Sequence, residues 1–169
     1  MPVFSSLPPS DDSVGRQPRS AARDPIALSL RLAPPEALLR VFIAEDSTDC
    51  QKRLIQLLEA TAVVRIEGCA ETVQDATREV LELKPDVLVL DLLLRDGSGL
   101  DVLRATAASN PSMRVAIVTN NATEQYRRAC EMAGAHAFLD KSLDIDRLPG
   151  LVRRWAAEKI GDPSPSETN

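Results

Sequence analysis

Short apolar runs and helical repeats of apolar residues alternate along most of this chain. The run Val87-Leu88-Val89-Leu90 contains no polar position and ends at Asp91. Such a run is too short for a buried helix and is typical of a central strand that is covered on both faces. Similar runs predict further strands at residues 39–44, 62–69, 115–119 and 135–139. Residues 92–98 are predicted to form a tight loop that leads into the next helix.

Between these strands, apolar residues recur every three or four positions, as they do on the buried side of a helix. Ser47 and Ser98 are predicted to cap two helices, and Gly134 to follow the end of another. Pro149 fits the last helix if Asp146 caps it, because first-turn N–H groups need no intrahelical acceptor. The predicted helices cover residues 48–60, 72–83, 98–109, 122–133 and 147–160.

Strict alternation of strands and helices predicts an α/β fold, a doubly wound (βα)5 parallel five-stranded sheet with helices on both faces. This domain is expected to span residues 38–160. Residues 1 to about 25 carry little apolar surface, so disorder is expected there. Residues 26–32 alternate like a half-buried strand, so the arm 1–37 either adds an edge strand or docks loosely. Residues 161–169 are expected to form a polar, disordered tail.

The composition excludes several classes of function. The net charge of −5 argues against non-specific nucleic-acid binding, and no apolar run is long enough to cross a membrane. The N-terminus lacks a basic segment followed by an apolar one, so a cytoplasmic location is predicted. The three cysteines are expected to be reduced thiols, and one histidine without a CxxC pair does not supply a zinc site.

Reactive side chains stand at the ends of four of the five predicted strands. They are Glu45 with Asp46, Asp91, Thr119 and Lys141. In a parallel sheet these ends lie along one edge, which is where such folds bind ligands. Neighbouring carboxylates repel each other unless a cation joins them, and Mg²⁺ prefers oxygen ligands. Together with a hydroxyl and an ammonium, the set is complementary to a phosphoryl group, which a carboxylate can take up as an acyl phosphate.

These residues belong to sequence words that resemble the receiver domain of bacterial two-component response regulators. The words are VFIAEDS at 41–47, DLLL at 91–94 running to Gly99-Leu100, Thr119, and GAHAFLDK at 134–141. Each word is weak alone, but together they stand at strand ends, in order and at matching spacing, over roughly residues 39–160. The resemblance implies the flavodoxin-like strand order 2-1-3-4-5.

By this resemblance Asp91 is the phosphoacceptor and Mg²⁺ is the cofactor. Asp46, Asp91 and the Leu93 carbonyl would bind the ion directly, and Glu45 would help through water. A histidine kinase or a histidine phosphotransfer protein would supply the phosphoryl group. The protein would be no enzyme beyond its own phosphorylation and dephosphorylation.

The resemblance also implies a switch and an output surface. Lys141 would pair with Asp91 and then with the phosphoryl group, which Thr119 would hydrogen-bond as it pulls its loop inward. Phe138 matches the aromatic position that rotates inward when this threonine moves. Because nothing after the last helix is long enough to be an output domain, no DNA-binding domain is expected. Output would be a contact with a downstream protein, made by the face of the fourth helix, fifth strand and fifth helix.

Several positions depart from the pattern of related receivers or vary among them. Arg95 stands where proline is frequent, and Leu93 and Asn121 occupy variable positions that tune phosphoryl lifetime. Ser142 follows Lys141, where proline after a cis peptide is usual. A cis bond costs about 2.5–4 kcal/mol before serine, against about 0.5–1 kcal/mol before proline. We therefore predict a trans Lys141–Ser142 bond and a rerouted loop after it.

Two other functions compete with this interpretation. The receiver fold can serve as a constitutive binding module with an idle site, against which the intact acids, Thr119 and Lys141 argue. The chain can also be a hydrolase with an aspartyl nucleophile, like the dehalogenase-type phosphatases. Those enzymes place a second aspartate two residues after the nucleophile as a general acid. Leu93 stands at that place and cannot transfer a proton.

Overall fold

The computed structural model describes residues 38–161, so the predictions for the N-terminal arm and for the tail beyond residue 161 lie outside the described residues. Five parallel strands form one sheet in the order β2-β1-β3-β6-β7. Counted along this sheet alone, the order is the predicted 2-1-3-4-5, so the fold prediction is confirmed. The strands are β1 Leu39–Ala44, β2 Val64–Ala70, β3 Val87–Leu90, β6 Arg114–Thr119 and β7 Ala137–Asp140.

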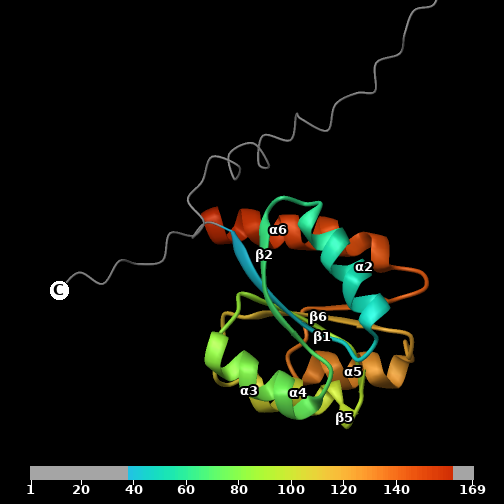
Figure 1. Cartoon of the computed structure of the whole chain (residues 1–169). Coiled ribbons are helices and arrows are strands. Elements are labelled where there is room, and N and C mark those ends of the chain that lie inside the picture. Colours follow the sequence, from blue (N-terminus) through green and yellow to red (C-terminus); the bar gives the residue numbers. More distant parts are fainter. Residues whose placement is uncertain (1–37, 162–169) are drawn as a thin grey trace, which may run out of the picture.

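Helices cover both faces of this sheet (Figure 1). The helices α2 (Thr48–Glu59) and α6 (Leu148–Gly161) lie on one face, and a 3₁₀ turn at Ile145–Arg147 precedes α6. The helices α3 (Val73–Leu83), α4 (Gly99–Thr106) and α5 (Glu124–Met132) lie on the other. Within residues 38–161, no helix combines the length and the apolar character needed to cross a bilayer.

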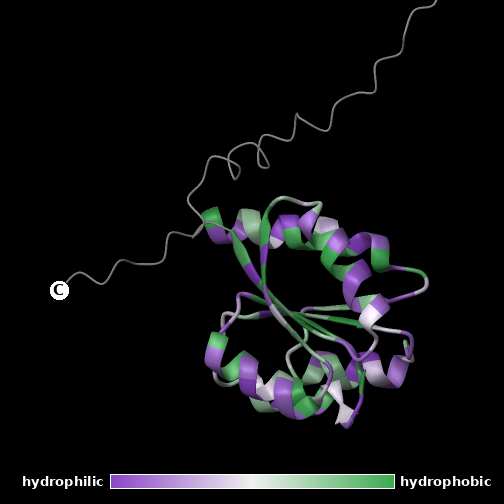
Figure 2. Ribbon diagram, viewed as in Figure 1, coloured by the Kyte–Doolittle hydropathy of each residue, from purple (hydrophilic) through white to green (hydrophobic). Residues whose placement is uncertain are grey.

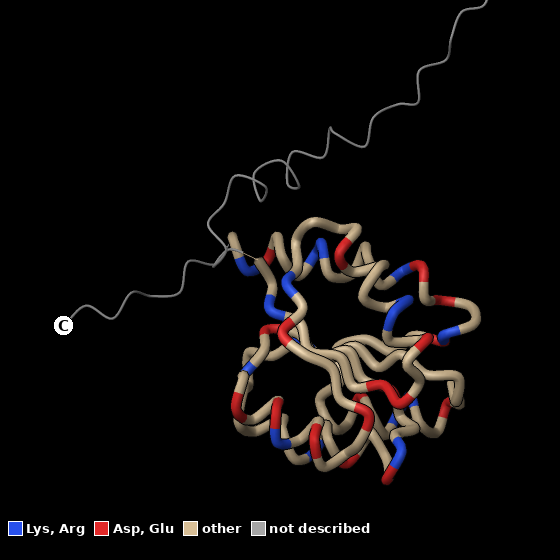
Figure 3. The backbone as a smooth tube through the Cα atoms, viewed as in Figure 1, with Lys and Arg blue, Asp and Glu red and all other residues tan. Residues whose placement is uncertain are grey.

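Each face of the sheet has its own apolar core, because side chains alternate along a strand. Val41 and Ile43 pack with α2 and α6, whereas Phe42 packs with α3 and α4. All four residues of β3 are buried, as predicted for a central strand. Figure 2 shows the apolar strands between helices of mixed polarity, and Figure 3 shows that most charges lie on helices and loops. The central strand β3 is therefore uncharged, and polar side chains follow the carboxyl ends of the strands.

Side-chain caps fix where the helices begin. Ser47 accepts a hydrogen bond from Cys50 N at 3.4 Å, and Ser98 accepts one from Leu100 N at 3.2 Å, as predicted. Gly134 has φ +101°, the left-handed conformation expected of a residue just past a helix end. Caps of this kind typically contribute about 1 kcal/mol each.

Several predicted boundaries are wrong by two or three residues. The strand predicted from residue 62 begins at Val64, because Ala62 adopts a positive φ of 58° in the preceding turn. The third helix ends at Thr106 instead of before Asn110, and the Ser109 hydroxyl donates to the Thr106 carbonyl at 2.7 Å. The last predicted strand starts at Ala137, because Ala135 N still bonds the helical carbonyl of Cys130.

Two further predictions need correction. Asp146 lies inside the 3₁₀ turn Ile145–Arg147 and does not cap the last helix, although Pro149 does fall in that helix's first turn. The segment after Asp91 is a small antiparallel hairpin of β4 (Leu93–Leu94) and β5 (Gly97–Ser98), where a plain loop was predicted. This hairpin gives the loop behind Asp91 a fixed shape.

Candidate functional site

The carboxyl ends of three strands bring four predicted site residues together. Glu45 and Asp46 follow β1, Asp91 follows β3, and Lys141 follows β7. Backbone hydrogen bonds continue past the strand ends, from Asp91 N to Ala44 O at 2.9 Å and from Lys141 N to Thr119 O at 3.0 Å. The sheet ladder therefore fixes the positions from which these side chains meet.

The side chains form one compact ionic cluster. The Nζ atom of Lys141 lies 2.5 Å from Asp91 Oδ2 and 2.5 Å from Glu45 Oε2. Carboxylate oxygens of Glu45, Asp46 and Asp91 all lie within 4.8 Å of one another. Glu45 is 1% exposed, Asp91 6% and Lys141 8%, whereas Asp46 is more accessible. Three carboxylates thus share one ammonium in a largely buried space.

Burial and charge act on these groups in opposite directions. Burial raises the pKa of Glu45 above its ordinary value and the Asp91 charge adds to this, while Lys141 offsets part of the rise. Burial alone would lower the pKa of Lys141, but its hydrogen bonds and charge interactions with Asp91 and Glu45 outweigh this and raise it. Lys141 is therefore held as an ammonium, and the cluster keeps a surplus of negative charge.

This surplus fits a hard divalent cation. The donor set consists of carboxylate oxygens, which Mg²⁺ prefers. Glu45 Oε2 is buried beside Lys141 Nζ, which Asp91 Oδ2 also contacts. Leu93, whose carbonyl is the fourth predicted ligand, is 57% exposed beside the site, and its N–H donates to Asp91 Oδ1 at 3.3 Å. The residues present can hold such an ion.

The two predicted switch residues lie on neighbouring strands next to this cluster. Thr119 is fully buried at the end of β6, and its Oγ1 accepts a hydrogen bond from Asn121 N at 3.2 Å. Phe138 is 6% exposed in the middle of β7. The Arg127 guanidinium carbon lies 4.6 Å from the centroid of its ring, and Arg127 Nη1 donates to the Phe138 carbonyl at 3.3 Å. Among residues 38–161, neither switch side chain makes a hydrogen bond with Asp91, whose carboxylate bonds Leu93 N and Lys141 Nζ.

The predicted trans geometry of the Lys141–Ser142 bond is confirmed. The Ser142 N–H, which proline would lack, donates to Asp140 Oδ1 at 2.7 Å. Asp144 N bonds to the Asp140 carbonyl at 2.8 Å and closes the loop. The loop thus follows its own path while Lys141 still reaches Asp91.

Sequence reasoning missed what fastens the hairpin behind Asp91. Asp96 Oδ1 accepts a hydrogen bond from Val73 N at 2.5 Å, so this carboxylate sits on the first turn of α3. Arg95 forms an ion pair with Glu71, and its own N–H donates to the Glu71 carbonyl at 3.0 Å. Arg95, noted above as standing where proline is frequent, therefore anchors the site loop. The distant partners left no signal in the local sequence.

Gly99 closes this hairpin against the end of β3. Its N–H donates to the Leu92 carbonyl at 3.0 Å. A Cβ atom at this position would overlap the Asp91 carbonyl oxygen, which is backbone and cannot turn aside. The glycine is thus required by close approach of two backbones directly behind the site.

The comparisons with known proteins agree with this geometry. The family model described as "Response regulator receiver domain" matches residues 41–153. A protein-glutamate methylesterase/protein-glutamine glutaminase of Myxococcus xanthus is 38% identical over 113 residues, which is 65% of this chain and 32% of that protein. The uncharacterized transcriptional regulatory protein YvfU of Bacillus subtilis is 32% identical over 122 residues, 72% of this chain and 61% of that protein. The chain thus spans between about a third and three fifths of the length of these relatives.

Solved structures share the fold. A response regulator receiver domain protein (CheY-like) from Methanospirillum hungatei superposes with a TM-score of 0.67 at 22% identity, covering 75% of this chain and 99% of that one. A DNA-binding response regulator of the LuxR family from Staphylococcus aureus gives 0.63 at 23% identity, covering 74% of this chain and 100% of that one. At these identities the likeness concerns the architecture alone.

Proposed function

The chain belongs to the response regulator receiver domain family, and on that premise we propose that it accepts a phosphoryl group on Asp91 in a two-component phosphorelay. The observation that carries this proposal is the setting of Asp91. Its carboxylate is 6% exposed at a strand end, and Lys141 Nζ lies 2.5 Å away among acids that outnumber it.

The reaction is an in-line transfer to a carboxylate. An Asp91 oxygen attacks phosphorus, and the bond from phosphorus to the donor breaks. In a phosphohistidine donor this is a P–N bond, and its electron pair stays on the imidazole. Asp91 becomes a mixed carboxylic–phosphoric anhydride, an activated intermediate that water can later hydrolyse. Lys141, held as an ammonium by Asp91 and Glu45, is placed to neutralise the phosphoryl oxygens.

Asp46, Asp91 and the Leu93 carbonyl, with Glu45 beside them, would hold Mg²⁺. When bound, the ion would neutralise the carboxylates and the charge that develops on the transferred group. Thr119 and Phe138 would then report the phosphoryl group to the surface, Thr119 by a hydrogen bond and Phe138 by packing. Histidine kinases or histidine phosphotransfer proteins are the proposed donors, and the face of α5, β7 and α6 is the proposed output surface.

Phosphoryl uptake tests this function. The protein is incubated with a small acyl phosphate and Mg²⁺, and its intact mass is measured. We expect the mass of one phosphoryl group to be added to the native protein and to Asp101→Asn, a control whose aspartate is 62% exposed on α4. We expect no gain in Asp91→Asn or without Mg²⁺. A gain that persists in either case contradicts the assignment, and an unmodified native protein favours the constitutive binding module.

A further inference from the structure

A groove of about 450 Å³ lies between α5 and α6, over the outer edge of the sheet. Its floor is β7, the edge strand, which pairs with β6 and with no other strand among residues 38–161. Arg127 and Glu131 of α5 form one wall, and Arg147, Gly150 and Arg154 form the other. A shallow trough beside an edge strand has room for a segment of another protein.

The charge of this groove is opposite to that of the chain. Three arginines and a single glutamate line it, whereas the whole chain has a net charge of −5. Two of the arginines have only long ion pairs with exposed carboxylates, Arg127 with Glu124 at 4.0 Å and Arg154 with Glu158 at 3.8 Å. Exposed pairs of this length contribute little to stability, so these two carboxylates hold the guanidinium groups only weakly. Arg127 also donates to the Phe138 carbonyl at 3.3 Å, and Arg147 pairs with Asp144 at 3.0 Å, so an acidic partner would compete with these contacts.

Gly150 has no side chain to fill the groove on its α6 side. A Cβ atom added at this position would have nothing within 4 Å, so no neighbouring atom requires glycine here. Its φ is outside the left-handed region. Glycine is among the least favourable helix residues, so packing within this fold gives no reason for it. Open space at Gly150 leaves room for an occupant between the arginines.

We propose that this groove binds an acidic peptide segment of the downstream protein, with carboxylates of that segment on Arg127, Arg147 and Arg154. The inference rests on the proposed function, which makes this face the output surface, and it adds the chemistry of the partner. Arginine favours carboxylates because its planar guanidinium can donate two parallel hydrogen bonds to one of them. Nucleic acid is the poorer match, because Glu131 lies in the groove and the rest of the chain is acidic.

Arg127 connects the groove to the proposed switch. The same guanidinium that lines the groove lies over the Phe138 ring and donates to the Phe138 carbonyl. A carboxylate that draws Arg127 outward removes a cation from the face of this ring, and so removes a favourable contact. Partner binding and the position of Phe138 are therefore coupled through one side chain.

The test measures binding of a fluorescein-labelled peptide of alternating glutamate and alanine to the full chain by fluorescence anisotropy. The probe variant is Arg147→Glu/Arg154→Glu, which leaves Arg127 and Phe138 untouched. Its matched control is Arg65→Glu/Arg78→Glu, with the same charge change on β2 and α3 at the other side of the sheet. Gly150→Leu is a second probe that fills the groove without changing its charge. Circular dichroism confirms that each variant is folded.

We expect the groove variant to weaken binding by about tenfold and the control pair by less than about twofold. Gly150→Leu should also weaken it, and the same peptide with glutamine in place of glutamate should not bind. Equal weakening by both pairs, equal binding of the two peptides, or tighter binding of a single-stranded oligonucleotide overturns the proposal. So does a dimer seen in sedimentation that Arg147→Glu/Arg154→Glu dissociates while the peptide does not bind.

The phosphoryl uptake assay separates this proposal from the one on which it rests. Both groove variants leave the Asp91 cluster intact, so they should gain the same mass as the native protein. If the native protein takes up the phosphoryl group but does not bind the peptide, only the proposal of a docking groove is contradicted. If the native protein does not take up the phosphoryl group but still binds the peptide through the groove, the proposed phosphorelay function is contradicted and the proposed docking site stands.

Discussion

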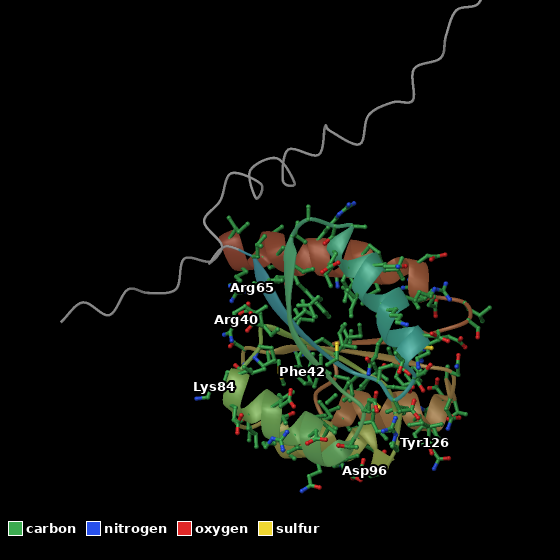
Figure 4. The ribbon with its side chains drawn as sticks, in the orientation of Figure 1. Arg40, Phe42, Arg65, Lys84, Asp96 and Tyr126 are labelled. Carbon is green, nitrogen blue, oxygen red and sulfur yellow. The ribbon has the colours of Figure 1, made fainter. Side chains whose placement is uncertain are left out.

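The two ends of the sheet both carry clusters of charged residues. Only at the amino end are the charges balanced by partners of opposite sign. At the amino end, Asp86 Oδ2 accepts hydrogen bonds from Arg40 N at 2.8 Å and from Lys159 Nζ at 2.7 Å. The Arg40 guanidinium donates to the Leu83 carbonyl at 2.6 Å and so caps the end of α3. Figure 4 shows Arg40 and Lys84 at this end, opposite Asp96 and Tyr126.

At the carboxyl end, the clustered carboxylates of Glu45, Asp46 and Asp91 outnumber the ammonium of Lys141, which pairs with Glu45 and Asp91. Two glutamates show the difference. Burial alone would raise the pKa of Glu67 at the amino end, but hydrogen bonds from Arg40 and Arg65 outweigh it and lower the pKa. At the carboxyl end, burial and Asp91 keep the pKa of Glu45 raised. The charges are thus balanced at the amino end, whereas carboxylates are in excess at the carboxyl end, where we propose that phosphoryl transfer occurs.

The largest expected effect is that of Gly99→Ala behind the carboxyl-end cluster. The new Cβ collides with the Asp91 carbonyl, so the backbone of one of the two segments must move. We expect a loss of about 3 kcal/mol of unfolding free energy, at the upper end of overpacking costs, and slow phosphoryl uptake. Gly150→Ala, where the added methyl meets open space in a helix, is the control and should be neutral or slightly stabilising. Equal melting temperatures for the two variants would contradict the close approach at Gly99.

Asp86→Ala should separate stability from function at the amino end. It leaves the Arg40 N–H and the Lys159 ammonium without their acceptor, so we expect a loss of about 2 kcal/mol in urea denaturation. Phosphoryl uptake at the far end should be unchanged. Asp101→Ala, which removes an exposed carboxylate, should be nearly neutral. If Asp86→Ala abolishes uptake, the two ends are not independent and the comparison fails.

The smallest expected effects are the pH dependences of the unfolding free energy that Glu67 and Glu45 contribute, which have opposite signs. Urea denaturation at pH 7.5 and at pH 4 would measure them. The lowered pKa of Glu67 gives stability that is present above its ordinary value of 4.5 and is lost as pH falls through the folded-state pKa. Glu67→Gln should therefore destabilise at pH 7.5 and do so less at pH 4.

The raised pKa of Glu45 has the opposite sign. Its ionisation opposes folding, and this cost grows as pH rises from its ordinary value of 4.5 to the folded-state pKa. Glu45→Gln should be neutral or slightly stabilising at pH 7.5, and this advantage should shrink at pH 4. Two glutamine variants that lose stability in parallel would show that both clusters are structural.

The strands, the helices and the cluster of acids were predictable because their signals are local, whereas the strand order followed from the resemblance to receiver domains. The apolar run before Asp91 sets a buried strand, and parallel strands necessarily place Glu45, Asp91 and Lys141 at one edge. The trans Lys141–Ser142 bond also followed from a local cost, the instability of a cis bond before serine. In each case the determining physics acts within a few residues.

Some of the missed features join residues that are distant in sequence. Others depend on a backbone conformation that cannot be inferred from the residue type. Asp96 bonds Val73, 23 positions earlier, and Arg127 covers Phe138, 11 positions later. Ala62 adopts a left-handed conformation that alanine does not favour, so the start of β2 was misplaced. The end of the third helix and the start of the last strand were misplaced for a similar reason, since side-chain and backbone hydrogen bonds in the adjoining turns decide them.

The most direct test of the central claim is to locate the phosphoryl group chemically. The protein is treated with a small acyl phosphate and Mg²⁺, reduced with borohydride and digested, and its peptides are sequenced by mass spectrometry. Borohydride converts an aspartyl phosphate to homoserine and leaves free aspartate unchanged. We predict homoserine at position 91 and unmodified aspartate at positions 46, 96 and 101. Homoserine at any of those three positions, or none at position 91, would contradict the assignment of Asp91 as the phosphoacceptor.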